Sequence, residues 1–234
     1  MNTSSLPARP AHLSPYAEAC LQALARQGWG DKLSLGGGVG LLHYLDYRPT
    51  HDVDAWWDQD TTPQMQQAIL EVIEDALRPW GEVATRTWGE VVSIELSQDG
   101  AKVFSFQIAR RSAQLEPSRS ASWVAVKLDS LSDLVASKMV ALVERGAPRD
   151  FLDIHAVCQA GLYTPVECWQ RWAARQRLSG SDTDEQRARL AVETHLKRIE
   201  LQRPLAEIAE PEQRATAAHV RAWFKEVFLN ALPL

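Results

Sequence analysis

The sequence lacks the features that would place the protein in a membrane or in an oxidising compartment. No apolar run approaches the roughly 20 residues that a membrane-spanning helix needs, and the N-terminal segment has no apolar core of the secretory type. Only three cysteines occur among 234 residues, with no CxxC pair, which argues against a structural zinc site. We therefore expect a cytoplasmic protein that makes no contact with a membrane.

An excess of positive charge is also missing. The formal net charge of −5 argues against a protein that binds nucleic acid over its whole surface, although a local basic patch is compatible with this charge. Arg110, Arg111 and Arg119 form one basic cluster, which would meet an RNA or nucleotide phosphate or simply belong to a solvated loop. We favour the solvated loop for the cluster. We also expect most of the nine tryptophans to fill cores.

The order of sequence patterns predicts an α+β fold, with a mixed sheet and flanking helices followed by a C-terminal helical bundle. Residues 1–13 are rich in Pro and Ser and are expected to form an arm or a loose tail, and residues 178–184 form the clearest linker. Gln98-Asp99-Gly100 between apolar runs predicts a hairpin. Strands are expected over 33–35, 52–57, 83–86, 91–96, 103–108 and 123–126, and helices over 14–27, 39–45, 63–78, 131–145, 148–160, 164–177, 184–200 and 212–230.

Asp52 and Asp54 are separated by one residue in a predicted strand. Alternate residues of a strand point to the same face, so these two carboxylates share a face and repel each other unless a cation lies between them. A hard divalent ion such as Mg²⁺ prefers carboxylate and phosphate oxygens, and such ions assist phosphoryl and nucleotidyl transfer. The pair alone is weak evidence, because DxD sequences are common on protein surfaces.

Three glycines, Gly36, Gly37 and Gly38, stand between a predicted strand and a predicted helix. Backbone N–H groups in such a turn suit a triphosphate, although the glycines by themselves are equally explained by a tight strand-to-helix turn. The phosphate interpretation gains weight because Arg48 and Thr50 stand just before the aspartate pair.

The segment LGGGVGLLHYLDYRPTHDVDAWW resembles the first motif of the nucleotidyltransferase toxins of abortive-infection systems (AbiEii/AbiGii type), within the DNA polymerase β-like superfamily. The family pattern is roughly Gly-Gly or Gly-Ser, a helix, then Arg-x-Ser/Thr-x-Asp-x-Asp. It corresponds here to Gly36, Gly37, Arg48, Thr50, Asp52 and Asp54, with Gly38 in place of the family's serine.

A second block, LDSLSDLVASKMVALVERGAPRDFLDIHAV, is similar to the family's lysine helix followed by Arg-Asp-x-x-Asp. The resemblance implies that Lys138 contacts nucleotide phosphates and that Asp153 is a catalytic-site carboxylate, with Arg149 and Asp150 supporting it. The competing interpretation makes Lys138 a solvated helix residue and Asp150 a helix cap.

Related enzymes usually carry a third carboxylate on a strand after the aspartate pair. Here the best-placed residue is the neutral Gln107, and Glu95 on the preceding strand is the acidic alternative. If Glu95 does not reach the pair, we expect Asp153 to take the proton from the attacking hydroxyl.

The resemblance implies a polymerase β-like nucleotidyltransferase core over residues 1–128, with its N-terminal helix, and a helical region over residues 129–234. It implies an enzyme that uses Mg²⁺ (or Mn²⁺) and an NTP, modifies a tRNA, another RNA or a protein, and is paired with a cognate antitoxin. Asp52, Asp54, Lys138 and Asp153 would be catalytic, Asp52 and Asp54 would bind the metal, and Gly36, Gly37, Gly38, Arg48, Thr50 and Lys138 would bind the nucleotide. The alternatives are a catalytically inactive nucleotide-binding or protein-interaction module on the same fold, and a structural helical adaptor.

Overall fold

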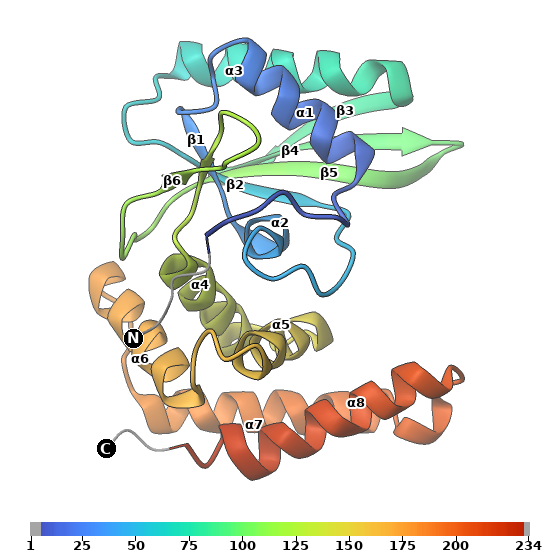
Figure 1. Ribbon diagram of the computed structural model, residues 1–234, viewed down its shortest axis with the longest axis vertical. Coiled ribbons are helices and arrows are strands. Elements are labelled where there is room, and N and C mark those ends of the chain that lie inside the picture. The colour runs from blue at the N-terminus through green and yellow to red at the C-terminus, as the bar shows by residue number, and fades with distance from the viewer. Residues whose placement is uncertain (1–5, 232–234) are drawn as a thin grey trace. The chain divides into compact units, whose positions relative to one another are not determined.

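The computed structural model of the protein describes residues 6–231, and the chain divides into two compact units that meet in sequence after Leu134. Of the described residues, the sheet unit (residues 6–134) contains a mixed sheet with helices, and the helical unit (residues 135–231) contains helices and no strand (Figure 1). The predicted α+β fold is therefore confirmed. The boundary expected between residues 128 and 129 stays a prediction. No helix within residues 6–231 combines the length and the apolarity needed to cross a membrane.

The sheet unit is built on seven strands in the order β3-β4-β5-β2-β1-β7-β6. β2 occupies the centre, parallel to β5 and antiparallel to β1. The strands are β1 (Leu33–Leu35), β2 (Val53–Trp57), β3 (Glu82–Trp88), β4 (Val91–Gln98), β5 (Ala101–Arg110), β6 (Arg119–Ser120) and β7 (Lys127–Leu128). The helices are α1 (Pro15–Arg26), α2 (Gly37–Leu42), α3 (Pro63–Leu77), a 3-10 turn (Arg78–Trp80) and the start of α4 (Leu131–Glu144).

Alternation along β2 gives the sheet one apolar face and one polar face. Val53, Ala55 and Trp57 are buried in the core, which α1 and α3 cover, whereas Asp54 and Trp56 point to the other face. Figure 1 shows α1 and α3 together on one side of the sheet and α2 on the opposite side. The aspartate pair therefore belongs to the polar face, as the period of two predicts.

Local turn chemistry accounts for the hairpin between β4 and β5. Asp99 and Gly100 both have positive φ, 51° and 76°, which is the conformation that a two-residue hairpin turn requires. The strand predicted over residues 123–126 is wrong. Val124 and Val126 are buried in the core from an irregular loop, and only the flanking β6 and β7 enter the sheet. The apolar pattern over residues 123–126 therefore reflects burial of the side chains and not pairing with a neighbouring strand.

The helical unit contains the rest of α4 and four further helices around an aromatic core. Ring centroids lie 4.7 Å apart for Phe151 and Phe224 and 5.3 Å apart for Trp169 and Phe228. Trp169 and Trp172 are buried in this core, whereas Trp80 and Trp88 of the sheet unit are exposed, so the expectation that most tryptophans fill cores holds for only some of them. The helices are α5 (Pro148–Gln159), α6 (Pro165–Ser179), α7 (Glu185–Gln202) and α8 (Pro211–Trp223), with a 3-10 turn (Leu205–Glu207) and a π-helical turn (Phe224–Phe228).

Several predicted boundaries differ from the observed ones. The helix expected from residue 39 begins at Gly37, the linker expected from residue 178 begins only at Gly180, and the last α-helix ends at Trp223. Of the predicted N-terminal arm, residues 1–5 lie outside the described part of the chain. Residues 6–13 are irregular but attached, since Ala8 donates its backbone N–H to the carbonyl of His43 at 2.8 Å.

Candidate active site

The glycine turn lies directly against the strand that carries the aspartate pair. Gly36 donates its backbone N–H to the carbonyl oxygen of Asp54 at 2.8 Å. Gly37 has a φ of +55°, and a Cβ atom at this residue would overlap the Asp54 carboxylate and lie 2.7 Å from its Cγ. Glycine is thus required at residue 37 both for its backbone conformation and for this close approach.

The neighbouring Gly38 faces the other half of the motif. A Cβ atom at Gly38 would lie 2.8 Å from Oγ1 of Thr50, and Arg48 donates a hydrogen bond to that same hydroxyl at 3.2 Å. The space that the family's serine side chain would fill is therefore taken by the Thr50 hydroxyl. The turn, the Arg-x-Thr segment and the start of β2 meet at one place on the sheet unit.

Asp52, immediately before β2, is held by the neighbouring strand β5. Its Oδ1 accepts hydrogen bonds from the backbone N–H of Ser105 at 3.1 Å and from the Ser105 hydroxyl at 2.7 Å. Ser105 is fully buried, so this arrangement is rigidly supported. Sequence reasoning missed Ser105, although its position two residues before Gln107 places both side chains on one face of β5.

Strand register decides between the two candidates for a third acidic residue. Gln107 pairs with Asp54 in the parallel β2–β5 register, so the neutral side chain lies beside the aspartate pair. Glu95 pairs with Ser105 one strand further out, and its carboxylate forms an ion pair with Arg86 at 3.2 Å. Gln107 therefore occupies the position where a third carboxylate was expected.

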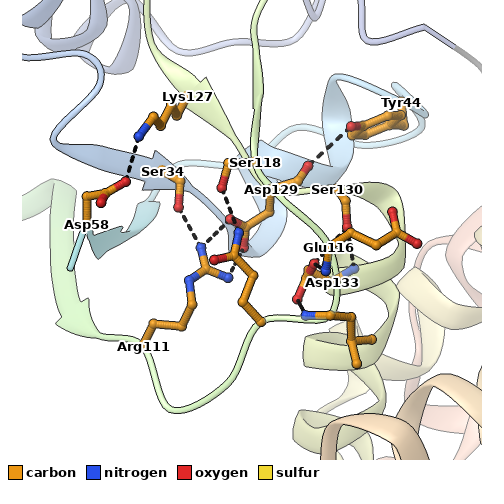
Figure 2. A network of polar contacts seen from close by, with 12 residues as sticks. Ser34, Tyr44, Asp58, Arg111, Glu116, Ser118, Lys127, Asp129, Ser130 and Asp133 are labelled. Carbon is orange, nitrogen blue, oxygen red and sulfur yellow. Dashed lines mark hydrogen bonds and ion pairs between the residues drawn. The ribbon is translucent and has the colours of Figure 1, made fainter. Parts of the chain in front are cut away.

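A buried polar network surrounds Ser34 of β1 (Figure 2). The Arg111 guanidinium donates to the hydroxyl of Ser34 at 2.5 Å, forms an ion pair with Asp129 and lies 5.8 Å from the ring centre of Trp56. Burial raises the pKa of Asp129, and the hydrogen bonds from Arg111 oppose that rise. No local sequence signal connects these residues, because they come from distant parts of the chain.

The second predicted motif forms its own contacts in the helical unit. Lys138 Nζ lies 2.6 Å from Asp153 Oδ2, and the two side chains are 9% and 0% exposed. The interpretation of Lys138 as a solvated residue is therefore wrong. The capping interpretation of Asp150 is confirmed, since its carboxylate accepts the backbone N–H of Ala147 at 3.1 Å and also pairs with Arg145.

The predicted site residues thus form two groups, one in each unit: Gly36, Gly37, Gly38, Arg48, Thr50, Asp52 and Asp54 in the sheet unit, and Lys138 with Asp153 in the helical unit. The oxygen donors of the first group suit a hard divalent ion, because Mg²⁺ is commonly bound by one or two carboxylates together with phosphate oxygens. Residues 6–231 contain no cluster of three or more His, Cys, Asp and Glu side chains placed to hold a metal.

Comparison with known proteins places this geometry in context. A family model described as the nucleotidyl transferase AbiEii toxin of type IV toxin–antitoxin systems matches residues 19–227. The chain is similar to the solved structure of a candidate nucleotidyltransferase from H. pylori, with a TM-score of 0.51 and 15% identity over 89% of this chain and 91% of that chain.

It is also similar to an antigenic nucleotidyltransferase-like protein from Paracoccidioides brasiliensis, with a TM-score of 0.40 and 14% identity over 88% and 92% of the two chains. The first likeness shows the fold alone, and the second is too distant to add to it. No curated protein matches the chain. Because the family model spans most of the sequence, the protein belongs to the AbiEii family of nucleotidyltransferase toxins.

Proposed function

We propose that the protein is a metal-dependent nucleotidyltransferase that moves a nucleotidyl group from an NTP to a hydroxyl of an RNA or a protein. The hydroxyl oxygen would bond to the α-phosphorus as the bond to the β-phosphate oxygen breaks and pyrophosphate leaves. It would act as the toxin of a toxin–antitoxin pair, with a cognate antitoxin as its partner. The observation that carries this proposal is the close approach of Gly37 to the carboxylate of Asp54. This contact brings the glycine turn, which would bind phosphate, next to the aspartate strand, which would bind the metal.

The sheet unit would bind the metal and the triphosphate. Asp52 and Asp54 would hold Mg²⁺ or Mn²⁺, and Ser105 would keep the Asp52 carboxylate in position. The bound ion would supply stabilisation of the negative charge on the phosphoryl oxygens. The first N–H groups of a helix have no partner within that helix, so the backbone of Gly37 and Gly38 is suited to phosphate oxygens.

The helical unit would supply the remaining charged groups. Lys138 would leave Asp153 to bind the nucleotide phosphates, and Asp153 would then accept the proton of the attacking hydroxyl. We keep residues 1–128 as the catalytic core and residues 129–234 as the region that contributes this pair. The cytoplasm is the proposed place of action, because it supplies NTPs and keeps thiols such as Cys20, Cys158 and Cys168 reduced.

Incorporation of α-³²P-labelled NTPs into a mixture of cellular RNA and protein tests the proposal. The wild-type protein with Mg²⁺ should label one class of acceptor, and Asp54→Asn should abolish the labelling because a metal ligand is lost. The matched control is Asp60→Asn, at an exposed aspartate of the β2–α3 loop, which should label as wild type does. Labelling that persists in Asp54→Asn would contradict the assignment.

A second candidate function is an inactive nucleotide-binding or interaction module on the same fold. Gln107 beside Asp54 favours it, because an amide is a weaker metal ligand than a carboxylate. Calorimetry with NTP and Mg²⁺ separates the two functions, since binding without any incorporation supports the module. In that case Gln107→Asp, which restores a third carboxylate, should produce measurable incorporation.

A further inference from the structure

A polar cavity of about 960 Å³ opens at the end of β2 that is remote from the aspartate pair. β2 and β5 run parallel and end at Trp57 and Arg110, so their carboxyl ends meet at the edge where the cavity lies. Ligands of open sheets with parallel strands commonly bind beyond these ends. Trp57 is the third residue after Asp54, so the cavity begins about 10 Å from the aspartate pair at the usual rise of a strand.

One wall of the cavity is fixed by the polar network that Figure 2 shows. Arg111 and Ser34 line the cavity, and Arg111 is neutralised by Asp129. Asp58 lines it as well and forms an ion pair with Lys127 at 2.6 Å, and this hydrogen bond lowers the pKa of Asp58. Because these charges are paired within the protein, the wall is rigid and close to neutral before any ligand arrives.

The remaining polar groups of the cavity are available to a ligand. The side-chain amides of Gln59 and Gln66 form no hydrogen bond among residues 6–231, and Gln114 bonds only to the hydroxyl of Ser118. An amide both donates and accepts, so it matches the edge of a nucleobase. Arg110 is exposed and lies 3.8 Å from the carboxylate of Glu90, which also lines the cavity, so a phosphate would replace Glu90 as the partner of this guanidinium.

The size and the rim of the cavity favour more than a single base. Its volume lies near the upper end of the range of about 300–1,000 Å³ for small-molecule sites. Trp88 does not itself line the cavity, but it directly precedes Gly89, which does, and it is half-exposed. A strand that leaves the cavity past Gly89 would meet this residue, and aromatic rings stack with the bases of single strands.

We propose that this cavity binds an unpaired strand of an acceptor RNA, upstream of the hydroxyl that reacts at Asp52 and Asp54. The inference rests on the proposed function and narrows its acceptor from RNA or protein to RNA. It also explains the basic cluster, in which Arg111 is a structural residue and Arg110 is the residue that meets phosphate. The base of the NTP and a segment of an acceptor protein are the other occupants that an experiment must separate.

Binding of a fluorescently labelled single-stranded RNA of about ten nucleotides to the full chain, without NTP, tests the cavity by anisotropy. Arg110→Ala should weaken binding about five- to tenfold and reduce the salt dependence by about one ion. The double variant Gln59→Ala/Gln66→Ala should weaken binding about tenfold and change the preference among bases. Arg26→Ala, at an exposed arginine of α1, is the matched control and should bind as wild type does.

RNA affinity that is unchanged in both cavity variants would overturn the proposal. A lower affinity for NTP·Mg²⁺ in these variants, with RNA affinity intact, would assign the cavity to the NTP base. A selective loss of protein labelling would assign it to a protein acceptor, and either result overturns the proposal. If RNA binding changes as expected but no NTP is incorporated by the wild-type protein, the cavity is confirmed and the proposed catalytic function fails.

Discussion

At the scale of single residues, Gly37 is required both for its positive φ and for its close approach to Asp54, and substitutions can separate these two effects. Gly37→Ala should abolish most of the labelling activity, about 100-fold, because the added methyl group displaces the Asp54 carboxylate from the site. Gly28 is the matched control, since its φ is +74° and a Cβ atom there meets nothing within 4 Å. Gly28→Ala should cost only the backbone strain, about 1–2 kcal/mol, and keep full activity. Equal activity of the two variants would refute the close-approach argument; thermal unfolding and labelling are the measurements.

Ser105 is predicted to be a positioning residue for the metal site. Ser105→Ala removes the 2.7 Å hydrogen bond to Asp52 Oδ1 and leaves the backbone bond in place. We expect the Mg²⁺ concentration for half-maximal labelling to rise about tenfold, as for other residues that orient metal ligands, with most of the activity regained at saturating Mg²⁺. Ser105→Thr, which keeps the hydroxyl, should restore the wild-type Mg²⁺ dependence. A residue of purely structural importance would lower activity without shifting that dependence.

At the scale of elements, the pair between α4 and α5 is predicted to serve both stability and activity. Asp153→Ala leaves Lys138 buried without the carboxylate it pairs with, and should cost about 3–5 kcal/mol in the free energy of unfolding. The double variant Lys138→Met/Asp153→Leu should regain most of that stability, because a buried ion pair can be replaced by apolar side chains. Urea unfolding measures both effects, and both variants should lose the NTP labelling that the wild type shows. Full labelling by the stable double variant would show that the pair is only structural.

The elements differ in how far local sequence predicts them. β2 and the β4–β5 hairpin follow from the alternation at Asp54 and from Asp99-Gly100, which act over a few residues. The strand predicted over residues 123–126 is wrong because buried valines look alike in a strand and in a loop that packs on the core. A strand differs from such a loop in having a partner strand, and which strand is the partner depends on residues far away in the sequence.

At the scale of the whole molecule, the lowered pKa of the buried His43 makes the free energy of unfolding depend on pH. Burial lowers the pKa of His43 below its ordinary value of 6.5, and its ring bonds to the carbonyl of Val39 at 2.8 Å and to the Trp123 indole at 3.2 Å. The unfolded chain therefore takes up a proton near pH 6.5, whereas the folded protein takes it up only at lower pH. The free energy of unfolding should consequently fall as the pH drops below 6.5, by up to about 1.4 kcal/mol per pH unit.

Urea unfolding of wild type and His43→Gln between about pH 7.5 and 5.5 measures this contribution, because the variant should show a flatter dependence in that window. Identical slopes for wild type and His43→Gln would contradict the assignment to His43.

The α+β order, the glycine turn and the shared face of Asp52 and Asp54 can be predicted from the sequence, because each depends on periodicity or on residues close together in the chain. The family is indicated by the resemblance of two motifs that lie far apart in the chain, and the family model confirms it. That Gln107 and not Glu95 lies beside Asp54, and that Ser105 holds Asp52, follows only from the folded chain. Likewise, only the folded chain paired Arg111 with Asp129 beside the cavity and buried Lys138 against Asp153. These contacts depend on strand order, strand register and helix packing, which join residues that local patterns cannot relate.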